Sequence, residues 1–356
     1  MNPVCANRAE ALSAKPRHFA PAVPAAGRGI TLTQGVPNFS IRARKPNRLK
    51  PTVFIHTNHK QIAGAIVAAR ALKRASKTPD AFDVKIIDIR DYSYFREYNG
   101  KSYLRGGEQR TWLFEDLQSF TPSRFMPPEL MGYEGRAVVI DPDIFAVADI
   151  MELLNSDMNG KAVLLLQRPR KDGGQERMTS VMLMDCAKLR HWNVEKSFRQ
   201  MFLSELDYSD WLSLKNEDPS TIGDLPHVWN HFDTLAPETK MLHTTNRRTQ
   251  PWKSGLPVDF RMDLEPAYKK TFAAIQRAIF GKELICKRYR PHPDLRQERL
   301  FFALLKECLE AGEISEQMLK DEMKKNHVRH DAFKVIANVK PLPPQERMHE
   351  FLTSPV

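Results

Sequence analysis

An apolar run near the middle of the chain, residues 137–140, leads directly into Asp141, Pro142 and Asp143. Such a run predicts a buried strand that carries two carboxylates at its end. Side chains two residues apart on an extended chain point to the same side, so both carboxylates can converge on one hard divalent cation such as Mg²⁺ or Mn²⁺. A solvated Asp-x-Asp turn is the alternative. The strand-end position favours the metal site, because ligands in open α/β sheets gather beyond the carboxyl ends of the strands.

Strand-like and helix-like segments alternate through this part of the chain. An Ala-rich stretch, residues 61–75, predicts a helix. Apolar runs predict further strands at residues 52–55, 84–89, 162–166 and 180–185. The alternation predicts an α/β sheet.

The remaining segments complete the expected organisation. Residues 92–110 are expected to form a loop or lid, and residues 111–125 a helix. Beyond Pro266, Lys-, Glu- and Leu-rich patterning predicts helices at residues 297–311 and 316–325. Three regions follow: a basic, Pro-rich and largely disordered tail over residues 1–50, an α/β domain over 51–264, and a helical subdomain over 265–356.

Positive charge is concentrated at the N-terminus. Of the formal net charge of +11, the first fifty residues supply about +8, from nine Lys or Arg against Glu10. The tail contains only Phe19 and Phe39 as aromatic residues, whereas nucleic-acid platforms interleave basic and aromatic side chains. We therefore expect no nucleic-acid partner. The tail can serve as a solubilising extension or as a docking arm for an anionic membrane surface.

Cysteine spacing and hydropathy bear on location. Cys5, Cys186, Cys286 and Cys308 lie far apart without a Cys-x-x-Cys pair, which favours reduced thiols in a cytosol-like compartment. No apolar run approaches the roughly 20 residues that span a bilayer, and the N-terminus lacks the apolar segment of a signal peptide. We expect a cytoplasmic protein whose membrane contact is at most peripheral.

Further motifs lie on both sides of the Asp141 strand end. They are the turn His56-Thr57-Asn58, Ser123-Arg124-Phe125, the strand Thr179-Ser180-Val181, Asn216-Glu217-Asp218, Leu225-Pro226-His227-Val228-Trp229-Asn230, and a last segment from Lys240 through His243 to Pro251-Trp252-Lys253. Their order resembles glycosyltransferase family eight, the glycogenin-like and lipopolysaccharide-galactosyltransferase-like enzymes. The resemblance covers residues 52–253, a little over half of the chain.

This resemblance implies the GT-A nucleotide-diphospho-sugar transferase fold, an α/β fold with a Rossmann-like mixed sheet flanked by helices, here with a helical C-terminal extension. It also implies a donor site. His56, Thr57 and Asn58 would receive the nucleotide base and ribose. Arg124 would reach toward the nucleotide sugar, and Ser180 would lie on the strand that faces the sugar.

The resemblance further implies metal ligands and phosphate-binding groups. Asp141, Asp143 and His243 would hold Mn²⁺ or Mg²⁺, and an imidazole beside two carboxylates favours Mn²⁺ over Ca²⁺. A histidine that follows a strand is also common as a purely structural residue. The glycine and lysine that the family has after this histidine are replaced here, so phosphate contacts would fall to basic residues such as Arg247 and Lys253.

Glu217 and Asp218 resemble an acidic segment near the acceptor side of the family. They would flank the anomeric carbon and stabilise an oxocarbenium-like state. The alternative for both is a solvated loop next to Pro219.

The implied function is that of a metal-dependent, hexosyltransferase-like glycosyltransferase. It would move a sugar from a nucleotide-activated donor, a UDP-sugar, to a saccharide or glycolipid acceptor with retention of configuration. A sugar nucleotidyltransferase is a second hypothesis, although the Gly-rich basic loop it ordinarily has is missing after Ile55. A non-catalytic binding protein on a transferase-like fold is a third.

Overall fold

The computed structural model describes residues 49–169, 173–259 and 288–355. The predicted basic tail lies outside these residues, apart from Leu49 and Lys50. The chain from Arg48 to Val356 clusters as one compact unit. The predicted boundary between residues 264 and 265 falls in a part of the chain that is not described and stays a prediction.

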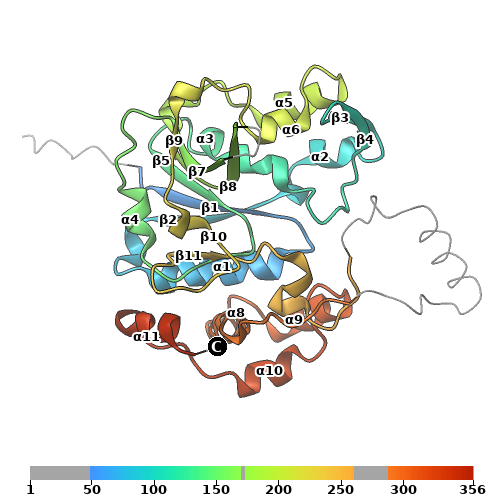
Figure 1. The fold of residues 1–356 in the computed structure, drawn as a ribbon. Coiled ribbons are helices and arrows are strands. Elements are labelled where there is room, and N and C mark those ends of the chain that lie inside the picture. The colour runs from blue at the N-terminus through green and yellow to red at the C-terminus, as the bar shows by residue number, and fades with distance from the viewer. Residues whose placement is uncertain (1–48, 170–172, 260–287, 356) are drawn as a thin grey trace, which may run out of the picture. The chain divides into compact units, whose positions relative to one another are not determined.

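A six-stranded mixed sheet forms the centre of this unit (Figure 1). Its strands lie in the order β2 (Asp83–Asp88), β1 (Thr52–Thr57), β5 (Arg136–Ile140), β8 (Gln175–Asp185), β7 (Val163–Pro169) and β9 (Ile222–Asp224). β1 is parallel to β2 and β5, β8 is antiparallel to β5 and β7, and β9 is parallel to β7. The predicted α/β class, with a Rossmann-like mixed sheet, is confirmed.

Alternation of side chains along the strands divides the core into two layers. Val53 of β1 and Val138 of β5 pack into the layer that contains helix α1 (Ile62–Ala75). Phe54 and Val139, one residue further along, pack into the layer on the opposite face. Neighbouring residues of a strand point to opposite faces. Since both faces are covered, the strands read as unbroken apolar runs in the sequence.

Short helices and two small sheets complete the part of the unit before residue 260. The layer opposite α1 contains α2 (Ser93–Glu97), α5 (Val194–Phe202), α6 (Tyr208–Leu212) and the hairpin of β3 (Ser102–Arg105) and β4 (Glu108–Thr111). Two further helices are α3 (Pro127–Leu130) and α4 (Ile150–Leu154). A three-stranded sheet joins β10 (His231–Phe232), β11 (Met241–His243) and β6 (Ile144–Ala146).

The end of the chain is helical and packs on the α1 side of the sheet (Figure 1). Its helices are α8 (Leu295–Glu310), α9 (Glu316–Lys324), α10 (Ala332–Asn338) and α11 (Met348–Thr353). Phe301 of α8 stacks on Trp252 with ring centroids 4.7 Å apart. Arg74 of α1 forms an ion pair with Glu307 of α8. The expected helical extension is therefore confirmed over the described residues 288–355.

Two expectations about the middle of the chain are wrong. Residues 92–110, expected to lack regular structure as a loop or lid, contain α2, β3 and most of β4. Residues 111–125 form turns and a 3₁₀ helix, η3 (Thr121–Phe125), rather than an α-helix. The side chains of Asn58 and Gln61 donate hydrogen bonds to the carbonyl of Leu117, at 3.3 and 3.1 Å. This carbonyl is therefore bound by side chains instead of by the backbone of a helical turn.

No described helix combines the length and the apolar character that crossing a bilayer requires. Cys186 and Cys308 are free and buried, whereas Cys5 and Cys286 lie outside the described residues. Burial raises the pKa of both described thiols to about 12. Both are therefore poor nucleophiles at neutral pH.

Gly64 lets α1 approach the loop that carries the two aspartates. A Cβ atom at Gly64 would lie 2.7 Å from the carbonyl oxygen of Pro142. We expect Gly64→Ala to lower the free energy of unfolding by about 1–2 kcal/mol, because the overlap outweighs the better helix propensity of alanine. Urea denaturation measures the change. Ala69→Ser adds one atom at a half-buried site of the same helix and should change stability by less than about 0.7 kcal/mol. Equal effects of the two substitutions would contradict this account.

Candidate active site

Asp141 follows the last residue of β5 and lies at the centre of a charged cluster. Its Oδ1 is 2.6 Å from Nε2 of His56 on the neighbouring strand β1. The same oxygen accepts a hydrogen bond from Arg124 at 3.0 Å. Burial by itself raises the pKa of Asp141, but the charges of Arg124 and His56 outweigh it and hold that pKa well below its ordinary value. The carboxylate is therefore ionised at neutral pH.

Arg124 belongs to η3 and is almost fully buried. Besides its bond to Asp141, it donates a hydrogen bond of 2.6 Å to the hydroxyl of Thr179 on β8. Its Nε is buried and has no hydrogen-bond partner among the described residues. Arg124 thus retains donor capacity beside the carboxylate.

Asp143 is fixed by the segment that follows β11. Gln250 donates a hydrogen bond of 3.1 Å to its Oδ2, and the amide of Thr244 donates one of the same length to its backbone carbonyl. The other carboxylate oxygen, Oδ1, is 3.5 Å from Nε2 of His243. This places Asp143 between Gln250 and the imidazole.

His243 ends β11, and its imidazole is held by Asn230. The Nδ1 of His243 is 2.8 Å from Oδ1 of Asn230, whose amide nitrogen donates to the hydroxyl of Ser180 at 3.0 Å. Because the Asn230 oxygen can only accept, Nδ1 carries the proton of a neutral His243 and Nε2 carries the lone pair. Burial by itself lowers the pKa of His243, but the carboxylates of Asp143 and Asp141 outweigh burial and raise it.

The three groups have the chemistry of a divalent metal site. One ligand atom from each of Asp141, Asp143 and His243 lies within 4.8 Å of the others. Two carboxylates and one imidazole suit Mn²⁺ and Mg²⁺. The hydrogen bond from His243 to Asn230 is the kind of outer contact that orients a metal-binding imidazole. The donor set therefore fits the predicted ion.

A cavity of about 1060 Å³ opens beside this cluster. Such a volume is at the upper end of the range for small-molecule sites. Its wall includes Asp141, Asp143, His243, Arg124 and Ser180 from the predicted site. It also includes residues to which no role was assigned from the sequence: Gln175, Glu176, Arg177, Thr179, Asp210 and Lys215.

The three residues predicted for base and ribose are buried and lie behind the wall. His56 contacts Asp141, as described above. Asn58 donates hydrogen bonds to the backbone carbonyl of Asp116 and to the hydroxyl of Ser119. The hydroxyl of Thr57 donates to the carbonyl of Asn58. His56 therefore lies beside Asp141, and the hydrogen bonds of Asn58 stabilise the turn at residues 116–119.

The two basic residues predicted for phosphate binding lie in different environments. Arg247 belongs to the cavity wall. Lys253 is only 1% exposed, does not belong to that wall, and forms an ion pair with Asp259. Tyr289 donates its hydroxyl hydrogen to the same carboxylate. Lys253 therefore has a structural partner within the described chain.

Glu217 and Asp218 also lie outside the residues that line the cavity. Glu217 accepts a hydrogen bond from the indole of Trp192 at 2.8 Å and pairs with His191. Asp218 accepts from the amide of Ser220 and begins η5 (Pro219–Thr221). Besides Asp141 and Asp143, the wall contains the acidic residues Glu176 and Asp210, and Asp210 pairs with Lys215.

Sequence reasoning missed three residues that shape the site. Asn230 stood within a selected motif without a role, and Thr179 preceded Ser180 in another. Gln250 stands where the resembled family has a lysine, and the structure binds it to Asp143. The sequence signal that could have identified Asn230 and Thr179 was their position inside two selected motifs.

Solved structures of glycosyltransferases are similar to this chain at low identity. A galactosyltransferase, LgtC, in complex with donor and acceptor sugar analogues, matches at 13% identity over 64% of this chain and 96% of that one, with a TM-score of 0.39. The glycosyltransferase GlyE of Streptococcus pneumoniae TIGR4 matches at 13% identity over 58% of each chain, with a TM-score of 0.40. Mouse xyloside xylosyltransferase 1 matches at 14% identity over 56% of this chain and 98% of that one, with a TM-score of 0.38.

No protein-family model and no curated protein matches this sequence. The residues of the cavity are therefore the basis on which function is inferred.

The different positions of Lys253 and Arg247 give a direct test of their roles. We expect Lys253→Met to lower the free energy of unfolding by about 2–3 kcal/mol, because it leaves the Asp259 carboxylate without its cation. If Arg247 binds phosphate as the sequence predicts, Arg247→Met should weaken binding of UDP in the presence of Mn²⁺ about tenfold, through loss of a charged hydrogen bond. Urea denaturation and titration calorimetry measure the two quantities for both variants. A large loss of UDP affinity in a folded Lys253→Met protein would show that this lysine binds phosphate.

Proposed function

We propose that this chain is a metal-dependent glycosyltransferase of the GT-A type. It transfers a sugar from a nucleotide-activated donor, a UDP-sugar, to a saccharide or glycolipid acceptor. The sequence resemblance supports retention of the anomeric configuration. A glycolipid acceptor would bring the chain to a membrane surface.

One observation carries the proposal: Asp141, Asp143 and His243 converge on the wall of a cavity large enough for a nucleotide sugar. Glycosyl transfer from such a donor needs neutralisation of the negative charge that accumulates on the departing diphosphate. A bound Mn²⁺ or Mg²⁺ supplies that neutralisation as a Lewis acid. The triplet, the cavity and the adjacent arginines together fit this requirement.

Arg124 and Arg247 both line the cavity wall. Guanidinium groups donate charge-assisted hydrogen bonds to phosphate oxygens in a fixed geometry. Arg124 is held in place by hydrogen bonds to Asp141 and Thr179. Because its position is set before a ligand arrives, it loses little conformational entropy on binding.

A carboxylate near the anomeric carbon would stabilise an oxocarbenium-like state. Glu217 and Asp218, selected from the sequence, do not line the cavity, whereas Asp210 of α6 and Glu176 of β8 do. We place this role on Asp210, because an ion pair holds its side chain. Lys215, which contacts both oxygens of Asp210 at 3.0 Å, keeps that carboxylate oriented at the wall.

A thermal-shift screen of nucleotide sugars with and without Mn²⁺ tests donor and metal together. We expect one nucleotide sugar to raise the melting temperature only when Mn²⁺ is present. At a ligand concentration of one hundred times Kd, the stabilisation is about 2.7 kcal/mol. Asp143→Ala should abolish the shift, because it removes one of three metal ligands. Asp157→Ala, at an exposed turn, is the matched control and should retain it.

Turnover assays of the same proteins separate the alternatives. Release of UDP from the donor supports the transferase. Release of pyrophosphate from a nucleoside triphosphate and a sugar phosphate would instead indicate a nucleotidyltransferase. If no nucleotide sugar shifts the parent protein and Asp143→Ala behaves like the parent, the transferase proposal is wrong.

Asp210→Asn and Glu217→Gln distinguish the two candidate positions for the catalytic carboxylate. We expect kcat of Asp210→Asn to fall at least a hundredfold with little change in donor affinity, because the lost charge acts in the transition state. Glu217→Gln should retain kcat within about fivefold, since its contacts with Trp192 are structural. Steady-state kinetics and donor titration provide both numbers. The reverse pattern would return the role to the acidic segment predicted from sequence.

A further inference from the structure

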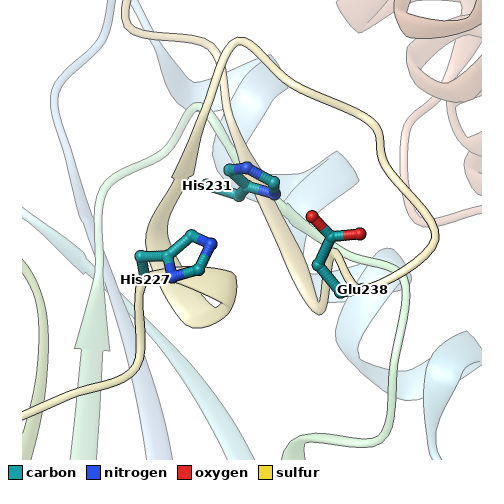
Figure 2. A group of neighbouring side chains, drawn as sticks. All are labelled: His227, His231 and Glu238. Atoms are coloured by element: carbon teal, nitrogen blue, oxygen red, sulfur yellow. The ribbon is translucent and has the colours of Figure 1, made fainter.

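Two histidines and a glutamate form a second cluster apart from the cavity wall. His227 begins the 3₁₀ helix η6 (His227–Asn230), His231 begins β10, and Glu238 lies in the loop at residues 233–240 (Figure 2). One ligand atom from each lies within 4.8 Å of the others. The rings of the two histidines meet edge to face, with centroids 5.2 Å apart. None of the three residues lines the cavity beside Asp141.

Backbone hydrogen bonds place the loop that carries Glu238 beside the two histidines. The amide of Lys240 donates a hydrogen bond of 2.9 Å to the carbonyl of Val228, so the end of the loop lies against η6. Within the loop, the amide of Thr239 bonds to the carbonyl of Ala236. The ammonium group of Lys240 pairs with Glu152, so a neighbouring carboxylate neutralises the cation next to the cluster.

The hydrogen bonds of Thr239 indicate which nitrogen of His231 offers a lone pair. The buried Thr239 hydroxyl contacts the Nδ1 of His231 at 2.7 Å, the amide of Ala236 at 2.9 Å and the carbonyl of Thr234 at 3.3 Å. A hydroxyl has one proton, and the Thr234 carbonyl can only accept. All three contacts are satisfied when His231 donates from Nδ1, which leaves Nε2 as the nitrogen available to a ligand.

We propose that His227, His231 and Glu238 form a second metal site that binds a transition-metal ion of the Zn²⁺ class. Two imidazoles and one carboxylate match a common three-ligand set for Zn²⁺, whereas Mg²⁺ and Ca²⁺ prefer oxygen ligands. Ligands of a tetrahedral Zn²⁺ site lie about 3.4 Å apart. Small rotations of the exposed His227 and Glu238 side chains close the remaining distance.

The position of the site gives it a structural consequence for the rest of the molecule. Asn230, which holds the imidazole of His243, lies in the segment between the two histidines. An ion bound to His227, His231 and Glu238 ties η6, β10 and the loop at residues 233–240 together. The second site therefore stiffens the segment from which Asn230 projects.

Zinc binding to full-length protein without a histidine tag tests the site. The Asp143→Ala background weakens the Asp141–Asp143–His243 triplet, so that zinc bound there does not obscure the result. We expect titration calorimetry of Asp143→Ala protein to show one Zn²⁺ bound, with little competition from millimolar Mg²⁺. Adding His227→Gln or Glu238→Gln should weaken that affinity at least tenfold, because each removes a ligand.

His330→Gln is the matched control, since it replaces an exposed histidine on another part of the surface. It should leave zinc affinity unchanged. In the Asp143→Ala background, saturation with Zn²⁺ should also raise the melting temperature by a few degrees and slow amide exchange across residues 227–240. Adding His227→Gln should abolish both effects without altering the melting temperature of the metal-free protein.

Three results would overturn the proposal. The first is absence of zinc binding in Asp143→Ala protein, which would mean that the aspartate triplet alone binds the ion. The second is a zinc affinity that is the same in Asp143→Ala protein and in the Asp143→Ala, His227→Gln double variant. The third is unchanged amide exchange across residues 227–240 at saturating zinc. Because these readouts need no sugar donor, failure of the second site is distinguishable from failure of the proposed transferase activity.

Discussion

The partly buried carboxylate of Asp141 joins three separate pieces of this molecule. Its partners are His56, which comes from β1, and Arg124, which comes from η3. A buried charge is tolerated only when it is paired and hydrogen-bonded, and removal of one partner typically costs about 3–5 kcal/mol. The pairing of β1 with β5 therefore does more than align two apolar strands, because it brings His56 within 2.6 Å of the aspartate. The path of the chain between residues 111 and 125 follows from the same requirement, since it must deliver Arg124.

The same ion pairs prepare the cavity for an anionic ligand. Arg124 would be costly to bury without a counter-charge, and Asp141 supplies one. Gln250 makes a hydrogen bond to Asp143, and Asn230 makes one to His243. Oδ1 of Asp143 and Nε2 of His243 then face each other. Rigid placement of this kind is what a site needs when it must stabilise charge that appears only during a reaction. The arrangement thus favours catalysis over passive binding.

The local sequence pattern predicted secondary structure correctly where one short segment determines it. The apolar run before Asp141 predicted β5, and the Ala-rich stretch at residues 61–75 predicted α1, because periodicity and burial agree there. The helix expected at residues 111–125 failed since Asn58 and Gln61, more than fifty residues earlier, bind a carbonyl of that segment. For Lys253 the phosphate role stays a prediction, and the motif from which it was selected stops short of Asp259, its ion-pair partner. The contact of Asn58 and Gln61 with residue 117 depends on which distant segments meet, and no local sequence pattern encodes it.

Residues 227–243 carry ligands of two different kinds within a short stretch of chain. His243 faces two carboxylates and is buried, an environment that suits a hard or borderline ion. His227 and His231 face one carboxylate at the surface, where nitrogen ligands predominate and zinc-class ions are preferred. Asn230 lies between these histidines and makes a hydrogen bond to His243, so a change that reorients η6 also alters the outer contact of the other imidazole. The two proposed ion sites are therefore coupled directly. Asn230 belongs to the segment that binds one ion, and its side chain makes a hydrogen bond to the histidine that binds the other.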